Sequence, residues 1–173
     1  MDASTLSAAR AYALDMHGAQ MYGTHPYSHH LDAVAATLEP YGPKAQVLGY
    51  LHDVVEDTSA EIDEVRQLFG ADVAACVALL TDEPGVNRKE RKSKTYAKLA
   101  TVSGPEELAL VVKAADRLSN VRACVADANL DLWNLYRSEH AVFKASAFRN
   151  GLCDELWSEL DDLLRDDGAS PVT

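Results

Sequence analysis

Apolar positions recur at intervals of three and four residues along most of the chain. In residues 4–20, for example, Leu6, Ala9, Ala13 and Met16 fall on one face of a helix. The same spacing predicts further helices over residues 30–38, 44–56, 60–68, 71–80, 88–100, 105–126, 130–148 and 152–165. No stretch keeps the alternation of a strand, so the pattern predicts an all-α fold with one domain over residues 1–166. Residues 167–173 are expected to form a disordered tail.

Two of these helices are predicted to begin at capping boxes, Thr58–Glu61 and Ser103–Glu106. In this motif a hydroxyl and a carboxylate three residues apart bind the free backbone amides of the first turn. The second box also places Pro105 in the first turn, where its missing N–H is not needed. We therefore expect helix starts at these two positions.

Composition and charge exclude several classes of partner. Apolar residues make up 47% of the chain and charged residues 25%, which is typical of a soluble globular protein. No apolar run approaches the ~20 residues of a membrane span, and the first residues lack the pattern of a secretory signal. Three separated cysteines, Cys76, Cys124 and Cys153, fit neither a disulfide framework nor a zinc ribbon. A cytoplasmic location without a membrane partner follows as an expectation.

The net charge of −11 argues against binding to nucleic acid, which requires positive charge to displace counterions. A small phosphorylated ligand is still compatible, because it depends only on local charge. Residues 87–94 hold five of the 16 basic residues, at Arg88, Lys89, Arg91, Lys92 and Lys94. A solvated helix face and a phosphate-binding surface are equally good interpretations of this cluster.

Three acidic residues, Asp53, Glu56 and Asp57, share one face of the predicted helix 44–56, and His52 lies one position away. Carboxylates on one face repel one another where apolar residues surround them. Water or a cation relieves this repulsion, and the apolar neighbours favour a cation. The stretch LHDVVEDT (51–58) is therefore a candidate metal-binding segment.

Residues elsewhere in the chain could complete such a site. Asp116 lies in a helix that is apolar on most sides, where an unpaired aspartate is costly. A histidine, His29 or His30, begins another apolar helix, and spacing does not choose between the two. Imidazoles and carboxylates together suit Mn²⁺, Fe²⁺ or Zn²⁺. From periodicity alone, a metal site and ordinary pairing of Asp116 with Lys113 or Arg117 are equally supported.

Four segments resemble the HD-domain metal phosphohydrolases, and most closely the hydrolase domain of RelA/SpoT proteins and the stand-alone small alarmone hydrolases. These segments are PYSHHLDAVA (26–35), LHDVVEDT (51–58), FGADVAACVALLT (69–81) and KAADRLSNVR (113–122). They keep the order of the family across about residues 10–125. The resemblance implies a single HD-domain helical bundle that removes the 3′-pyrophosphate of ppGpp or pppGpp and returns GDP or GTP.

The resemblance also implies a metal, usually Mn²⁺, bound by His30, His52, Asp53 and Asp116. Aligning from the Pro-Tyr loop selects His30 over His29. The makeup of the proposed site is thus two imidazoles and two carboxylates from three separate segments.

Glu56 and Asp57 match the acidic pair thought to position and activate the attacking water, and Asn120 matches a residue near the nucleotide. For the phosphates, the basic segment offers Arg88, Lys89 and Arg91 as candidate ligands. The expected partner is therefore a small nucleotide, and the sequence makes no prediction of oligomeric state.

The chain departs from the family pattern at several positions, in the loop before the first metal histidine and in two of the matching segments. Gln20 and Met21 stand where an Arg-Lys pair is usual, Leu31 replaces a proline, and Ser119 replaces a histidine. His25 could substitute only in part for the missing charge. Reaction type is therefore better supported than substrate, and ppApp, NADPH or another nucleotide phosphate are alternatives. A non-catalytic nucleotide-binding HD module and a helical bundle without a site are further alternatives.

Overall fold

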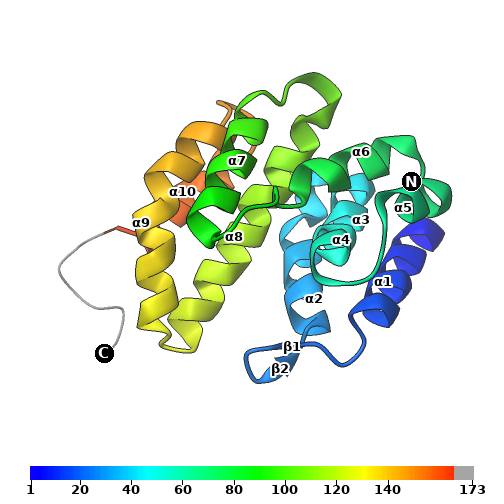
Figure 1. Cartoon of the computed structure of the whole chain (residues 1–173), viewed down its shortest axis with the longest axis horizontal. Coiled ribbons are helices and arrows are strands. Elements are labelled where there is room, and N and C mark those ends of the chain that lie inside the picture. Colours follow the sequence, from blue (N-terminus) through cyan, green and yellow to red (C-terminus); the bar gives the residue numbers. More distant parts are fainter. Residues whose placement is uncertain (166–173) are drawn as a thin grey trace.

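The periodic segments form helices in the computed structural model, which describes residues 1–165 (Figure 1). The α-helices are α1 (Ala3–His17), α2 (Ser28–Thr37), α3 (Pro43–Leu51), α4 (Val54–Asp57), α5 (Ile62–Phe69), α6 (Ala71–Leu80), α7 (Arg88–Ala100), α8 (Leu108–Ala126), α9 (Leu130–Ala147) and α10 (Asp154–Leu163). Two 3₁₀ turns, η1 (Glu39–Tyr41) and η2 (Gly104–Glu107), precede α3 and α8. The all-α prediction is confirmed, whereas the predicted tail 167–173 lies outside the described residues. Within the described chain, none of the helices has the length and apolarity required to cross a membrane.

Helix α8 runs through the middle of the bundle, with α9 and α10 on one side and α2, α3 and α6 on the other (Figure 1). Its apolar residues, such as Leu110, Val112 and Leu118, are fully buried. This enclosure explains why its sequence is apolar on most sides. Lys113 and Arg117 are also buried in this helix, so their charges must find partners inside the protein.

The predicted single helix 44–56 is wrong, because the chain forms α3 and α4 with a turn at His52 and Asp53 between them. The side chain of His52 gives the physical reason. Its Nδ1 lies 2.7 Å from the carbonyl oxygen of Gly49, which Asp53 N–H would use in an unbroken helix. The helical hydrogen bond from Asp57 N to Asp53 O remains, at 2.9 Å, so Asp53 and Asp57 still share a face.

The segment predicted as a loop before α2 contains a short antiparallel hairpin, β1 (Met21–Tyr22) with β2 (His25–Pro26). The expectation of no strand is therefore wrong in this detail. Strands of two residues carry no alternation that a sequence pattern could reveal. Gly23 has a φ of 59° in the turn, a conformation that glycine adopts without strain. The hairpin lies at the N-terminal end of α2 (Figure 1).

Neither predicted capping box forms. Helix α5 begins after Glu61, and the hydroxyl of Thr58 instead donates to the carbonyl of Val54, the first residue of α4, at 2.5 Å. Ser103 makes no side-chain cap, because η2 precedes α8. Both α-helices therefore begin two or three residues later than the motif predicts.

Candidate metal centre and active site

Two imidazoles and two carboxylates converge where α2, α8 and the turn after α3 meet. Nε2 of His30 lies 3.3 Å from Nε2 of His52 and 3.3 Å from Oδ1 of Asp116. Nε2 of His52 lies 3.0 Å from Oδ2 of Asp53 and 3.5 Å from Oδ1 of Asp116. Ligand atoms of His30, His52 and Asp53 all lie within 4.8 Å of one another, so one metal ion could contact all three.

The protonation of this cluster fits a divalent cation. Nδ1 of His52 faces the Gly49 carbonyl, which fixes the proton on that nitrogen and leaves Nε2 free as a ligand. Burial lowers the pKa of His52, but Asp53 and Asp116 reverse this effect and raise it well above its usual value. The two carboxylates thus attract a positive charge to Nε2, and a metal ion would replace that proton.

Of the two candidate histidines, the structure places His30 in the cluster. His30 is buried, whereas His29 is exposed and stacks on His25 with ring centroids 4.5 Å apart. Tyr22 from the hairpin stacks on the His30 ring, with ring centroids 4.7 Å apart. The alignment from the Pro-Tyr loop thus selects the histidine that faces the other proposed ligands.

Asp53 and Asp57 are joined by a hydroxyl that sequence reasoning missed. Tyr27 donates to Oδ2 of Asp53 at 2.5 Å and lies 3.1 Å from Oδ2 of Asp57. Gln20 also donates to Asp57, at 3.2 Å. Asp57 is therefore held next to the candidate metal site by the segment before α2.

Glu56 is held by a different part of the chain. Its Oε2 accepts a hydrogen bond from the backbone N–H of Asp82, at 2.9 Å. The side chain stays open to solvent on one side. Partial burial raises the pKa of Glu56, and the carboxylates of Asp82 and Asp53 act in the same direction, whereas Lys113 and the hydrogen bond from the Asp82 backbone oppose them.

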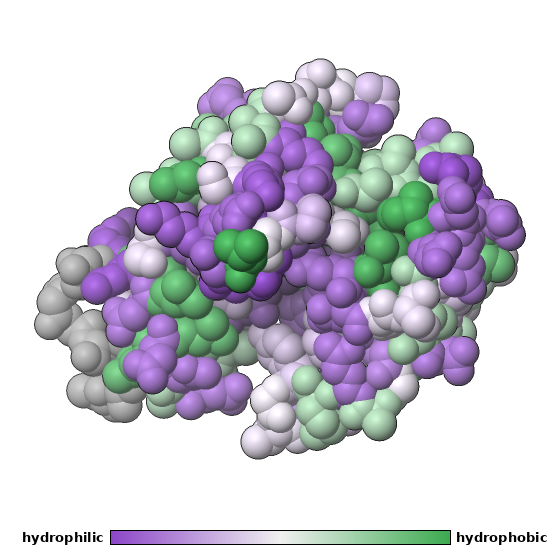
Figure 2. Space-filling view, viewed as in Figure 1, coloured by the Kyte–Doolittle hydropathy of each residue, from purple (hydrophilic) through white to green (hydrophobic). Residues whose placement is uncertain are grey.

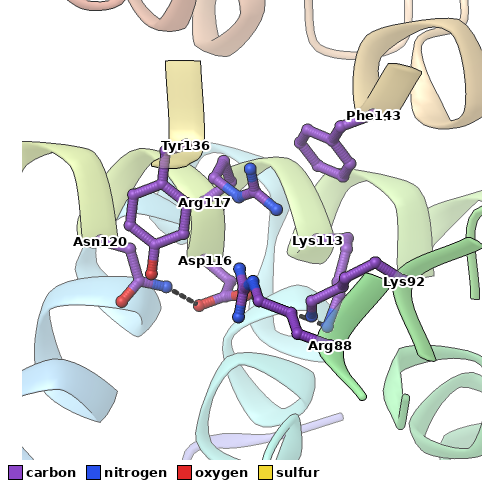
Figure 3. A pocket seen from close by; sticks show the side chains of 8 residues that line it. All are labelled: Arg88, Lys92, Lys113, Asp116, Arg117, Asn120, Tyr136 and Phe143. Atoms are coloured by element: carbon purple, nitrogen blue, oxygen red, sulfur yellow. Dashed lines mark hydrogen bonds and ion pairs between the residues drawn. The ribbon is translucent and has the colours of Figure 1, made fainter. Parts of the chain in front are cut away.

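A small cavity of about 70 Å³ adjoins the cluster at Asp116 (Figure 3). Its lining comes from α7, α8 and α9 and comprises Arg88, Lys92, Lys113, Asp116, Arg117, Asn120, Tyr136 and Phe143. Four of these residues are cationic and one is acidic. Hydrophilic residues also border the hollow at the middle of the molecule in Figure 2. A chain with a net charge of −11 thus presents a locally positive cavity beside its candidate metal site.

The predicted basic residues do not all reach this cavity. Arg88 lines it, whereas Lys89 is exposed and lines a separate groove between α7 and α9. Arg91 lines neither the cavity nor that groove. Lys92, four residues after Arg88 and on the same helix face, lines the cavity and pairs with Asp82 at 2.7 Å. The spacing of Arg88 and Lys92 was a signal that could have selected this pair.

Two residues of α8 support Asp116 directly. Asn120 donates to Oδ1 of Asp116 at 2.7 Å and accepts a hydrogen bond from the hydroxyl of Tyr22, also at 2.7 Å. Nζ of Lys113 lies 4.0 Å from Oδ2 of Asp116 and donates to the carbonyl of Leu80 at 2.9 Å. Burial lowers the pKa of Lys113, but the surrounding carboxylates, Asp116 first, raise it above its usual value. A charged ammonium therefore stands between the cluster and the cavity.

Comparison with known proteins finds the same combination of fold and motifs. Residues 7–153 match a family described as "HD domain". A probable guanosine-3′,5′-bis(diphosphate) 3′-pyrophosphohydrolase of Synechocystis is 32% identical over 161 residues, which cover 90% of this chain and 21% of that protein. The Drosophila melanogaster 3′-pyrophosphohydrolase MESH1 is 32% identical over 120 residues, 68% of this chain and 65% of that protein.

A solved structure titled "A metazoan ortholog of SpoT hydrolyzes ppGpp and plays a role in starvation responses" superposes with a TM-score of 0.81. Sequence identity is 25%, and the match covers 97% of this chain and 98% of the other. The chain thus spans about a fifth of the length of the Synechocystis relative and nearly the whole of the solved structure. The resemblance drawn from the sequence motifs is confirmed.

Proposed function

The chain belongs to the HD-domain family, and we propose that it is a metal-dependent alarmone hydrolase. In the proposed reaction, water cleaves the 3′-pyrophosphate from ppGpp or pppGpp and leaves GDP or GTP. The observation that carries the proposal is Asp116, which is shared between an imidazole and carboxylate cluster and a cavity lined by four cations. Relatives named as ppGpp 3′-pyrophosphohydrolases support the same substrate.

The proposed metal ligands are His30, His52, Asp53 and Asp116. The proposed metal is Mn²⁺. Nitrogen and oxygen donors in this mixture suit Mn²⁺, Fe²⁺ or Zn²⁺ better than metals that prefer thiolates. When bound, such an ion lowers the pKa of a coordinated water and neutralises phosphate charge. The protein supplies the orientation of the donors, for example through the Gly49 carbonyl behind His52.

Glu56 is the proposed proton acceptor for the attacking water. Its raised pKa makes it a better base near neutral pH than an ordinary carboxylate. The Asp82 amide holds one oxygen of Glu56 and leaves the other free to accept a proton. Asp57, held by Tyr27 and Gln20, is proposed to orient the same water.

The cations of the cavity are the proposed ligands of the pyrophosphate that leaves. Arg88, Lys92, Lys113 and Arg117 place positive charge where negative charge develops as the bond breaks. Asn120 lies on the same wall and is proposed to contact the nucleoside. Lys89 and Arg91, which do not line the cavity, would contribute through their longer-range attraction for the anion.

A second nucleotide substrate is favoured by one observation at the hairpin. Gln20 is bound to Asp57, and Met21 is 56% exposed, so neither residue offers a cation to the guanosine side of a substrate. This makes ppApp or NADPH an alternative for the same chemistry.

We also place the protein in the cytoplasm, since its three buried cysteines are free thiols, as expected in a reducing compartment.

A substrate panel tests the proposal. The purified chain would be incubated with Mn²⁺ and ppGpp, pppGpp, ppApp, NADPH or a deoxynucleoside triphosphate, and the products separated by chromatography. The highest kcat/KM is expected for ppGpp or pppGpp, with no turnover in EDTA. Preference for ppApp or NADPH would establish the alternative substrate. Normal Mn²⁺ binding without turnover of any nucleotide would leave only a non-catalytic binding module.

A further inference from the structure

Glu139 on α9 binds two arginines of the cavity at once. Its carboxylate accepts hydrogen bonds from Nε and Nη2 of Arg88, at 2.8 and 3.1 Å. Nη2 of Arg117 lies 3.3 Å from the same carboxylate and donates to the hydroxyl of Tyr96 at 3.0 Å. The side chain of Glu139 is only 16% exposed. Hydrogen bonds between charged groups in such a partly desolvated place are strong and directional.

Each of the two guanidinium groups keeps one end unbound. Nη1 of Arg117 is buried and has no hydrogen-bond partner among the described residues. The rings of Tyr136 and Phe143 lie on Arg117 with centroids 4.6 Å from its central carbon, so this group cannot turn freely. Arg88 likewise uses Nε and Nη2 for Glu139, and its Nη1 has no hydrogen bond within the described part of the chain. A buried donor without an acceptor is costly, so the position of Arg117 Nη1 favours an added acceptor.

Glu139 lies on the outer side of these arginines. It lines the groove of about 690 Å³ between α7 and α9 but does not line the polar cavity. Arg88 lines both spaces, and Arg117 lines the cavity (Figure 3). The carboxylate therefore holds Nε and Nη2 of Arg88 and Nη2 of Arg117 from the groove side, while both residues line the cavity.

We propose that Glu139 is a positioning residue that turns Arg88 and Arg117 into a fixed two-point seat for a phosphate group. The seat requires only a phosphate anion in the cavity. Its assignment to the pyrophosphate that leaves the nucleotide rests on the proposed function. Glu139 itself touches neither the substrate nor the metal, and it acts through the two arginines.

Glu139→Gln tests this role, because it keeps the shape of the side chain and removes its charge. Inorganic pyrophosphate would be titrated calorimetrically into the Mn²⁺-loaded wild-type chain and variant. We expect the dissociation constant of pyrophosphate to rise about tenfold, because the charge-assisted hydrogen bonds to Arg88 and the ion pair with Arg117 are both weakened. In turnover, KM should rise by a similar factor while kcat stays within twofold. Unchanged or tighter binding would overturn the proposal, since Glu139 would then only reduce the positive charge of the cavity.

A matched control comes from a second glutamate that binds an arginine with both oxygens. Glu159 accepts from Nε and Nη2 of Arg122, each at 2.7 Å, on the surface. Glu159→Gln should leave pyrophosphate binding unchanged, and a matching loss in this variant would overturn the specific role of Glu139.

A second variant keeps the proposal testable if Glu139→Gln folds poorly. Arg88→Lys keeps the charge but cannot form the two-point contact with Glu139, so it should also weaken pyrophosphate binding, and unchanged binding would contradict the two-point seat. Where Glu139→Gln folds, the double variant should bind pyrophosphate no more weakly than the worse single variant, and additive losses would contradict coupling of the two residues. Weakened pyrophosphate binding in a chain that hydrolyses no alarmone would support the seat and refute the proposed function. Alarmone hydrolysis by the wild-type chain, together with unchanged pyrophosphate binding in the variant, would support the proposed function and refute the seat.

Discussion

Replacement of Tyr27 by phenylalanine tests how the metal centre is held. Tyr27 is 8% exposed, and its hydroxyl is shared by Asp53 and Asp57. Tyr27→Phe removes that hydroxyl and keeps the ring that stacks on His17, 4.3 Å between centroids. Asp53 then loses the donor that orients it toward the proposed metal site, and two carboxylates are left without a shared partner.

The size of the effect on metal binding follows from the loss of a group that orients a metal ligand. Such a loss lowers metal affinity about 10–100-fold, or about 1.4–2.8 kcal/mol at 1.4 kcal/mol per tenfold. We therefore expect Tyr27→Phe to weaken Mn²⁺ binding by about 10–100-fold. The lost hydrogen bond to a charged group should separately lower folding stability by about 1.5–3 kcal/mol.

Calorimetric or electron-paramagnetic titration of Mn²⁺ into the metal-free wild type and variant measures this change. Tyr41→Phe is the matched control, since Tyr41 lies in η1 and outside the cluster, and its metal affinity should equal that of the wild type. An Mn²⁺ dissociation constant for Tyr27→Phe within twofold of the wild-type value would refute the assigned role of Tyr27.

Three further substitutions separate metal binding, turnover and packing. Asp116→Ala should abolish Mn²⁺ binding, because it removes the carboxylate within 3.5 Å of both imidazoles, and retained binding would exclude Asp116 as a ligand. Glu56→Gln should bind Mn²⁺ normally but lower kcat by about 10²–10⁴-fold, and normal turnover would exclude Glu56 as the proton acceptor. Gly49→Ala should destabilise the fold by about 1–3 kcal/mol through overpacking. The added Cβ would lie 2.8 Å from Leu38 Cδ1 and 3.3 Å from Ala35 Cα, and an unchanged urea midpoint would contradict this close approach of α3 to α2.

The periodicity of apolar residues predicts most helices because each of them buries one face against the core. Helices α6 and α7 begin and end where the spacing and the flanking loops predict. The break between α3 and α4 escapes such reasoning, since one side-chain contact between His52 and Gly49 decides it. The capping box at Thr58 fails for a similar reason, because its hydroxyl is used locally: it donates to the Val54 carbonyl and accepts from the backbone N–H of Ala60.

The candidate site divides in the same way. Repulsion among carboxylates and the cost of a lone buried aspartate indicate Asp53 and Asp116 from the sequence alone. Tyr27 and Glu139 could not be found by spacing, because their partners lie on other elements, 26 residues away for Asp53 and 51 for Arg88. Rules of helical spacing relate residues within one element, whereas these contacts depend on how the elements pack.

Phosphorus-31 NMR of ppGpp turnover tests the central claim most directly. With Mn²⁺ and the purified chain, the 3′-diphosphate resonances should disappear while GDP and inorganic pyrophosphate appear in equal amounts, and EDTA should stop the reaction. Release of orthophosphate, or turnover at an equal rate in EDTA, would contradict a metal-dependent 3′-pyrophosphohydrolase.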